Sequence, residues 1–106
     1  MTVRGRFAPT PSGRMHLGNL FSALLAWLDA RSQGGVMVLR IEDLDTQRTS
    51  LELARQIADD LAWLGLDWDE GGVEPAWRQS ERGEYYQAAF DRLEKMGLVY
   101  PCYCSR

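Results

Sequence analysis

Three features that often reveal a protein's location or chemistry are scarce in this sequence. No apolar run approaches the ~20 residues that a membrane-spanning helix needs. The first residues, MTVRGRF, lack the apolar stretch of a signal peptide. The only cysteines, Cys102 and Cys104, are too close together for an ordinary disulfide, so they do not indicate secretion. We therefore expect a cytoplasmic protein without a membrane partner.

Positive charge is also in short supply. The 106 residues carry a net charge of −3, and Lys95 is the only lysine. A domain that bound nucleic acid mainly through its own electrostatics would usually be basic. The charge therefore argues against broad non-specific binding, and any RNA partner has to be inferred from motifs. The pattern G-x-x-x-x-G-K-[ST] is absent, which excludes a P-loop nucleotide site.

The length permits one small domain, and its expected elements alternate. Residues 3–8 predict a short strand, residues 17–31 a helix with apolar residues at helical spacing, and residues 36–41 a second strand. Thr49 and Glu52 match a capping box that opens a second helix. This alternation is typical of an α/β fold in which parallel strands are joined by crossover helices.

The remainder predicts one more helix and little further sheet. The segment LGLDWDEGG indicates a turn-rich loop, Ser80 is a candidate cap for a third helix, and Gly97 lies beyond that helix's expected end. Residues 98–100 have an extended pattern. The buried face expected for the third helix comprises Tyr86, Ala89, Phe90 and Leu93. A sheet of two or three strands should be marginally stable alone, or self-associate through its exposed edge.

The loop after the first strand is the most informative one. Ligands of open α/β sheets bind beyond the carboxyl ends of the strands, where a loop leads into a helix. Residues 9–19, PTPSGRMHLGN, occupy that place. Gly18 leaves room for a ligand, the amides near Asn19 and Leu20 are available to a phosphate, and His16 can donate a hydrogen bond to a phosphate oxygen. A histidine at a helix start is also commonly a cap.

Four blocks of the sequence match known family motifs. RFAPTPSGRMHLGN resembles R-F-A-P-[ST]-P-[ST]-G-x-x-H-[IVLF]-G, with HLGN at the place of the "HIGH" motif. LRIEDLDTQR resembles R-I-E-D-x-D-x-x-R, WLGLDWDEG resembles W-L-G-L-x-W-D-E-G, and YPCYCSR resembles the C-x-C start of a zinc-binding insertion. Together, these blocks resemble the glutamyl-tRNA synthetase family of class I aminoacyl-tRNA synthetases. The resemblance implies that residues 1–106 are the N-terminal portion of a Rossmann-like catalytic domain, truncated at that insertion.

The resemblance also implies an enzyme and a site. The family activates L-glutamate with ATP to glutamyl-adenylate and transfers it to tRNA, a ligase-type reaction in which Mg²⁺ is the expected counter-ion. Arg6 stands where the family contacts a glutamate carboxylate, and Glu42 where it binds the ammonium group. Ala8 and Thr10 frame the amino acid. The residues that the resemblance assigns to ATP are His16, Gly18 and Asn19, with His16 as the catalytic group.

The acidic residues of the second block also have simpler interpretations. Without the family, Glu42 would be an ordinary strand-end acid that pairs with Arg40 or Arg48. Asp43 and Asp45 suggest a metal site, but carboxylates at this spacing are more often solvated or capping groups. Both interpretations depend on which partners the folded chain places beside these carboxylates.

The family's zinc and second phosphate sites are only partly represented. Cys102 and Cys104 match the first half of the zinc site, whereas a structural Zn²⁺ site needs four ligands. The KMSKS loop, which supplies the family's second phosphate-binding lysine, has no counterpart in these residues. We therefore expect zinc in an intact protein, and no activity of the 106-residue chain alone.

The tRNA acceptor separates two branches of the family. The I-E-D-L-D segment, HLGN and YPCYCSR resemble the glutamyl-Q tRNA(Asp) synthetases, which load glutamate onto the queuosine of tRNA(Asp). Glutamyl-tRNA synthetases, which charge tRNA(Glu), usually carry I-E-D-T-D. The favoured partner is therefore tRNA(Asp), with tRNA(Glu) as the alternative. A non-catalytic domain that binds a nucleotide or a protein partner is the third possibility.

Overall fold

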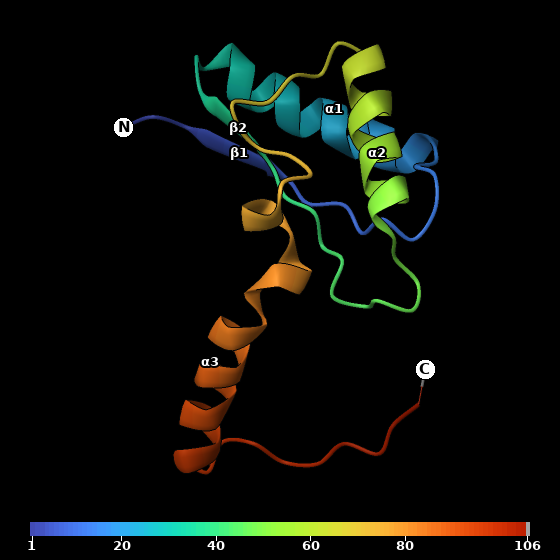
Figure 1. Ribbon diagram of the computed structural model, residues 1–106. Helices are drawn as coiled ribbons and strands as arrows, with labels where there is room; N and C mark the ends of the chain where they lie inside the picture. Colours follow the sequence, from blue (N-terminus) through green and yellow to red (C-terminus); the bar gives the residue numbers. More distant parts are fainter. Residues whose placement is uncertain (106) are drawn as a thin grey trace.

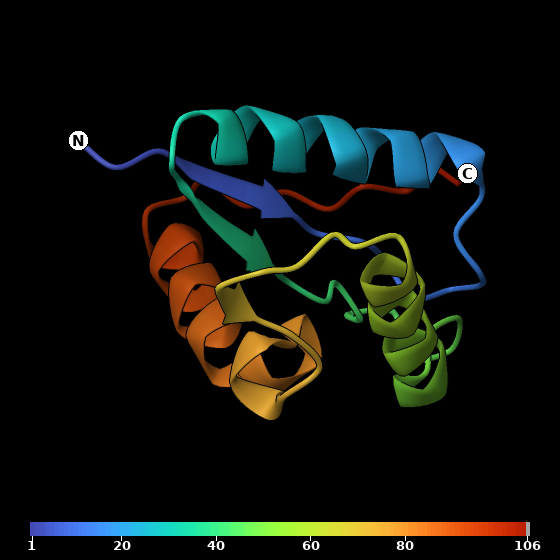
Figure 2. The same cartoon turned by 90° about the horizontal axis from the view of Figure 1, so that it is seen from above.

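A parallel three-stranded sheet organises the chain, in the order β1–β2–β3 (Figures 1 and 2). The computed structural model describes residues 1–105. The strands are β1 (Arg4–Phe7), β2 (Val36–Leu39) and β3 (Glu70–Gly71). The helices are α1 (Leu17–Ser32), α2 (Leu51–Trp63) and α3 (Gly83–Lys95), with two 3₁₀ turns, η1 (Pro75–Trp77) and η2 (Gln79–Arg82). The predicted α/β fold with crossover helices is confirmed.

The third strand was not predicted, because it lies inside the segment that indicated a loop. It has only two residues, too few for any alternation of side chains to show in the sequence. Gly71 has a φ of +99°, and a Cβ there would lie 1.8 Å from the carbonyl oxygen of Leu39. A glycine is therefore required for β3 to approach β2 this closely.

Helices α1 and α2 pack on the sheet face that carries Phe7, Met37 and Leu39. Leu39 and Ile41 are almost completely buried there. The core that joins the two helices to the sheet comprises Ala23, Leu39, Ile41, Ala54, Ile57, Leu61 and Leu66. The outer side of α1 stays apolar and exposed at Leu17, Phe21 and Leu25. No helix among residues 1–105 is long and apolar enough to cross a membrane.

The opposite sheet face is open and charged. Strand alternation places Arg4, Arg6, Val38 and Glu70 on this face. Arg4 donates hydrogen bonds from both terminal nitrogens to Glu70, at 2.9 and 2.6 Å, and so ties β1 to β3 across β2.

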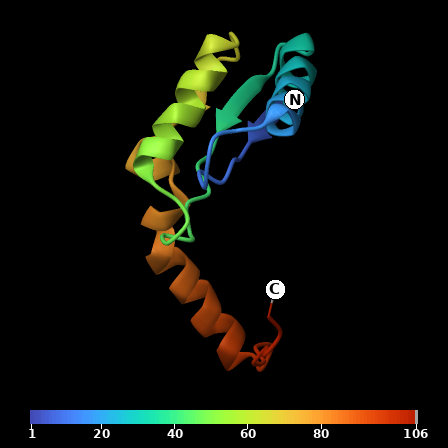
Figure 3. The ribbon, with the colours of Figure 1, turned by 90° about the vertical axis from the view of Figure 1, so that its right-hand side faces the viewer.

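Helix α3 points away from the sheet instead of packing on it (Figures 1 and 3). It has no buried residue, and the expected buried face is wrong: Ala89, Phe90 and Leu93 are exposed, and only Tyr86 is half-buried. The amphipathic pattern indicates a face that can pack, but it does not determine what packs on it. Helix α3 ends as predicted, with Gly97 at a φ of +71°.

Two predicted helix caps are also wrong. Ser50, and not Thr49, caps α2 by accepting a hydrogen bond from the amide of Leu53 at 3.1 Å. The Thr49 hydroxyl donates instead to the carbonyl oxygen of Asp45 at 2.7 Å. Ser80 lies inside η2 and caps no helix. Adjacent Ser and Thr residues both fit a cap, and the sequence does not show which backbone turns first.

An ionic cluster joins the C-terminal end of α1 to the loop before β3. The Arg31 guanidinium donates to Asp69 at 2.7 Å and to Asp67 at 2.9 Å. The indole N–H of Trp27 also donates to Asp67, at 2.9 Å, and the amide of Met37 donates to Asp69 at 2.7 Å. The Trp27 and Arg31 bonds lower the pKa of the Asp67 carboxyl. The Met37 amide and then Arg31 lower the pKa of the Asp69 carboxyl.

These lowered pKa values predict how stability depends on pH. A carboxyl with a lower pKa in the folded chain stabilises it above the unfolded pKa, near 3.8, and loses that contribution as pH falls through the folded value. We expect Asp69→Asn to melt at a lower temperature than the unchanged chain near neutral pH. The two melting temperatures should converge below about pH 4. Asp59→Asn, on the exposed side of α2, is the matched control. A difference in melting temperature that stays constant down to about pH 3 would contradict a stabilising role of the Asp69 carboxylate.

Candidate active site

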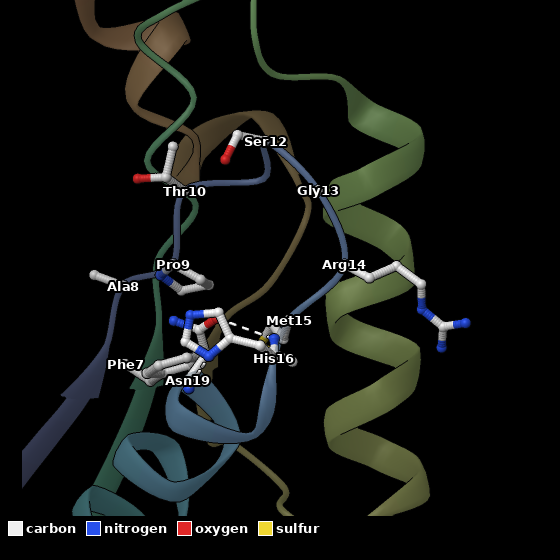
Figure 4. A pocket seen from close by; sticks show the side chains of 10 residues that line it. All are labelled: Phe7, Ala8, Pro9, Thr10, Ser12, Gly13, Arg14, Met15, His16 and Asn19. Carbon is white, nitrogen blue, oxygen red and sulfur yellow. Dashed lines mark hydrogen bonds between the residues drawn. The ribbon is translucent and has the colours of Figure 1, made fainter.

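The loop between β1 and α1 encloses a cavity of about 430 Å³ (Figure 4). Two backbone bonds fix the loop: the amide of Glu42 donates to the carbonyl oxygen of Pro9 at 2.9 Å, and that of Ser50 to Pro11 at 3.3 Å. Pro11 is fully buried. The lining residues are Phe7, Ala8, Pro9, Thr10, Ser12, Gly13, Arg14, Met15, His16 and Asn19. Four of the predicted site residues therefore share this cavity: Ala8, Thr10, His16 and Asn19.

His16 is the N-cap of α1. Its Nδ1 accepts hydrogen bonds from the amides of Gly18 at 3.1 Å and Asn19 at 3.3 Å, and the side-chain oxygen of Asn19 accepts from the His16 amide at 3.1 Å. Because Nδ1 accepts, the proton of the neutral imidazole is on Nε2. The cap thus fixes the tautomer whose Nε2–H can donate to a ligand.

The helix amides near Asn19 and Leu20 are not free, which corrects the sequence-based expectation. The Asn19 amide is bonded to His16 Nδ1, and the Leu20 amide donates to the His16 carbonyl oxygen at 3.2 Å. Gly18 also has a structural role beside the ligand-binding role that stays a prediction. A Cβ at Gly18 would lie 2.9 Å from the His16 ring, so the missing side chain makes room for the imidazole.

Arg6 and Glu42 converge on the open side of the sheet, next to the loop. Arg6 lies in β1, and Glu42 follows β2 at the carboxyl ends of these parallel strands. Arg6 Nη1 is 3.9 Å from Glu42 Oε1, and the two side chains are 57% and 33% exposed. Glu42 does not pair with Arg40 or Arg48, the partners that the simpler interpretation required. A half-exposed ion pair at this distance leaves both groups available to a ligand.

Asp43 and Asp45 are engaged as structural groups. Asp43 accepts hydrogen bonds from the amide and hydroxyl of Ser80, at 2.8 and 2.7 Å. Asp45 accepts from the Gln47 amide at 3.2 Å and lies 3.7 Å from the Arg48 guanidinium. No group of three or more His, Cys, Asp or Glu side chains within residues 1–105 is arranged to hold a metal ion.

Cys102 and Cys104 lie next to each other at the surface. The amide of Cys104, and then its thiol, lower the pKa of the Cys102 thiol. A thiol with a lowered pKa forms the thiolate more readily, and thiolates are the ligands that Zn²⁺ prefers. The pair therefore fits half of a tetrahedral zinc site.

The sequence did not reveal two contacts that fix the loop. Asn19 matters through its side-chain oxygen, which closes the capping box, and the spacing His16-x-x-Asn19 could have indicated this. Arg14 holds the loop to α2 by pairing with Asp60 at 3.0 Å. No sequence signal identifies that pair, because the two residues are 46 positions apart.

The fold and site define a class: an α/β protein of the Rossmann-like type, with a ligand loop at the carboxyl end of its first strand. The chain belongs to the family of class I tRNA synthetases for glutamate and glutamine (E and Q), whose catalytic-domain model matches residues 2–106.

Relatives and solved structures agree with this family. The chain is 58% identical to a glutamyl-Q tRNA(Asp) synthetase from Symbiobacterium thermophilum, over 96% of this chain and 33% of the relative. It is 52% identical to glutamate–tRNA ligase 1 from Halorhodospira halophila, over 99% of this chain and 23% of the relative. A crystal structure of a glutamate tRNA ligase from Elizabethkingia meningosepticum, in complex with its amino acid, matches with a TM-score of 0.78 and 39% identity. That match covers 90% of this chain and 20% of the ligase. The chain thus spans a third or less of these proteins.

Substitution separates the helix cap of His16 from the other properties of its imidazole ring. His16→Ala removes the cap of α1 and should lower the free energy of unfolding by about 1 kcal/mol. His16→Asn keeps a cap acceptor but removes the outward Nε2–H, so stability should stay within a few tenths of a kcal/mol. Urea denaturation followed by circular dichroism measures both. An equal decrease in the free energy of unfolding in the two variants would show that the imidazole stabilises the chain by something other than the cap.

Proposed function

We propose that this chain forms the glutamate-binding side and the histidine-bearing half of the ATP site in an enzyme that activates L-glutamate as glutamyl-adenylate. The observation that carries the proposal is the Arg6–Glu42 pair, which lies at the carboxyl ends of β1 and β2 beside the loop that presents His16. The membership of the family supports the reaction class. The names of the relatives support glutamate as the amino acid.

The pair matches an amino acid that carries charges of both signs. Arg6 offers a guanidinium fork to a carboxylate, and Glu42 offers a carboxylate to an ammonium group. A bound glutamate inserts between them, so each group exchanges a weak 3.9 Å contact for a direct one. Thr10 and Ala8, on the loop that follows β1, would border the same ligand.

The chemistry then requires a donor near the α-phosphate of ATP. A glutamate carboxylate oxygen attacks the α-phosphorus, and the bond from that phosphorus to the pyrophosphate oxygen breaks. His16 can donate through Nε2–H to the phosphate oxygens, with a ring orientation set in advance by the cap. Mg²⁺ bound to the triphosphate would neutralise part of its charge. Asp43 is already bonded to Ser80, so we assign no metal ligand to it.

Two tRNA acceptors remain for the second step. The I-E-D-L-D segment and the match to glutamyl-Q tRNA(Asp) synthetases at 58% and 50% identity support the queuosine of tRNA(Asp). Glutamate–tRNA ligases at 52% and 49% identity support tRNA(Glu) as the second candidate. In a longer chain, Cys102 and Cys104 would supply two of four ligands to a structural Zn²⁺.

Segment exchange tests this proposal. Residues 1–106 replace the matching segment of the S. thermophilum glutamyl-Q tRNA(Asp) synthetase, and separately that of the H. halophila ligase. We expect glutamate-dependent ATP–pyrophosphate exchange from both chimeras and none from the 106-residue chain alone. Transfer closer to the parental rate in the first chimera, assayed with queuosine-containing tRNA(Asp), would favour that acceptor. Two folded chimeras without exchange would refute the proposal.

His16→Asn, made in the active chimera, should slow adenylate formation by ~10²-fold or more, because a donor to the transferring phosphate is lost. Since this variant keeps the helix cap, the loss cannot be attributed to unfolding of α1. ATP–pyrophosphate exchange measures the rate. A wild-type rate would remove His16 from the reaction and leave it with its structural role only.

Arg6→Ala in the same chimera should raise the KM for glutamate far more than the KM for ATP. In the proposed site the Arg6 guanidinium contacts the amino acid, and Arg6 does not line the loop cavity where ATP would bind. Arg4→Ala is the matched control, because it removes another exposed, ion-paired arginine from β1 that does not line the loop cavity. An equal rise in both KM values would indicate general damage instead of a glutamate contact.

A further inference from the structure

A second cluster of cations lies on the open side of the sheet. A cavity of about 220 Å³ is lined by Arg40, Ala76, Trp77 and Arg82. Arg40 follows β2 and, by strand alternation, its side chain is on the same sheet face as Val38. Trp77 belongs to η1 and Arg82 to η2. Segments far apart in the sequence therefore bring two guanidinium groups to one cavity, which we call the Arg40–Arg82 cavity.

No acidic side chain within residues 1–105 forms a salt bridge with Arg40 or Arg82. The arginines that do are Arg4, Arg6, Arg14, Arg31, Arg48 and Arg78. Three acids close to these residues in the sequence have other partners: Asp43 accepts from Ser80 with both oxygens, Glu42 is 3.9 Å from Arg6, and Glu81 is 3.6 Å from Arg78. Two like charges at one cavity repel each other, and an anion between them relieves this repulsion.

Neutral aromatic side chains hold both cations in place. Arg40 Nη2 donates to the hydroxyl of Tyr86 at 2.9 Å. The Arg82 guanidinium carbon lies 4.6 Å from the centre of the Tyr85 ring. These contacts orient the guanidinium groups without neutralising them, and each retains further N–H donors. A site whose donors are already oriented loses less entropy when it binds.

We propose that the Arg40–Arg82 cavity binds a phosphate group, and specifically a phosphodiester of an RNA strand. One guanidinium fork fills both oxygens of a planar carboxylate, whereas a tetrahedral phosphate presents oxygens to two forks that approach from different segments. Trp77 lines the same cavity and offers a surface on which a neighbouring base can stack.

The choice of RNA as the source of the phosphate rests on the proposed function, whereas the phosphate chemistry does not. Arg40 and Glu42 are two residues apart in strand-like backbone, since the amides of both donate to the β1 side, to Phe7 and Pro9. The cavity therefore borders the proposed glutamate site, which the acceptor strand of a tRNA has to reach. A local pair of arginines also reconciles RNA binding with a net charge of −3.

Inorganic phosphate is the first probe, titrated into the 106-residue chain in a phosphate-free buffer. NMR follows the Trp77 indole N–H and the arginine Nε–H signals. We expect saturable shifts at Trp77, Arg40 and Arg82. Arg40→Gln and Arg82→Gln should each raise the Kd about tenfold or more, because charge-assisted hydrogen bonds are lost. Arg55→Gln and Arg92→Gln, two exposed arginines outside the cavity and without an acidic partner, should change it less than about twofold.

Several outcomes would overturn the phosphate site: no saturable shift at Trp77, equal losses in the control variants, or acetate bound as tightly as phosphate. Circular dichroism verifies that each variant is folded. Arg82→Gln removes only a stacking contact with exposed Tyr85 and should fold even if Arg40→Gln does not. A loss of binding in Arg82→Gln with unchanged circular dichroism supports the site on its own.

Further arms distinguish the source of the phosphate. A single-stranded RNA trinucleotide should bind more tightly than AMP or inorganic phosphate. The slope of log K against log salt for the trinucleotide should decrease by about 0.7 when Arg40 and Arg82 are both replaced, as expected for one phosphate contact. Equal affinities for the three ligands, or an unchanged slope, would overturn the RNA assignment. These binding measurements need no catalysis. A negative result in them is therefore distinguishable from a negative result in the test of glutamate activation.

Discussion

The parallel pairing of β1 with β2 is the constraint on which the rest of the structure depends. The pairing matches Arg6 with Val38, and backbone bonds continue it past the strand ends, from Arg40 to Phe7 and from Glu42 to Pro9. These bonds place the end of β1, the loop that follows it and the segment from Arg40 to Glu42 at the same edge of the sheet. A slip of one residue would turn Arg6 toward α1 and separate it from Glu42. The register therefore fixes both the fold and the proposed amino-acid site.

The sequence predicted what periodicity and turn residues determine, and failed where partners distant in the chain decide. Helix α1, strands β1 and β2 and the turn at Gly97 have local signals, and the structure confirms them. Strand β3 depends on the approach of Gly71 to Leu39, which no local pattern encodes. The choice of Ser50 over Thr49 as a cap depends on where the backbone turns, and the apolar side of α3 has no partner within residues 1–105.

The candidate site was predictable only where a motif fixed the residues. The resemblance indicated Arg6, Glu42 and His16, and the structure places the first two 3.9 Å apart, beside the loop that carries the third. Their roles stay predictions, because proximity does not identify a ligand. The sequence could not show that the Asn19 amide is bonded to His16, since two residues that are good phosphate contacts separately can satisfy each other.

Net charge was a poor guide to the electrostatics of this chain, because acids and arginines are matched pair by pair. Asp67 and Asp69 bind Arg31, and Glu70 binds Arg4, so much of the negative charge is neutralised away from the ligand edge. Near that edge lies the Arg6–Glu42 ion pair, whose charged atoms are 3.9 Å apart. Arg40 and Arg82 lie close by and form no salt bridge within residues 1–105. Whether a protein of this net charge binds an anion therefore depends on which arginines its own acids leave unmatched. Two such arginines, Arg40 and Arg82, share a cavity just beyond the carboxyl end of β2, and substrates of α/β proteins bind at that end of a strand.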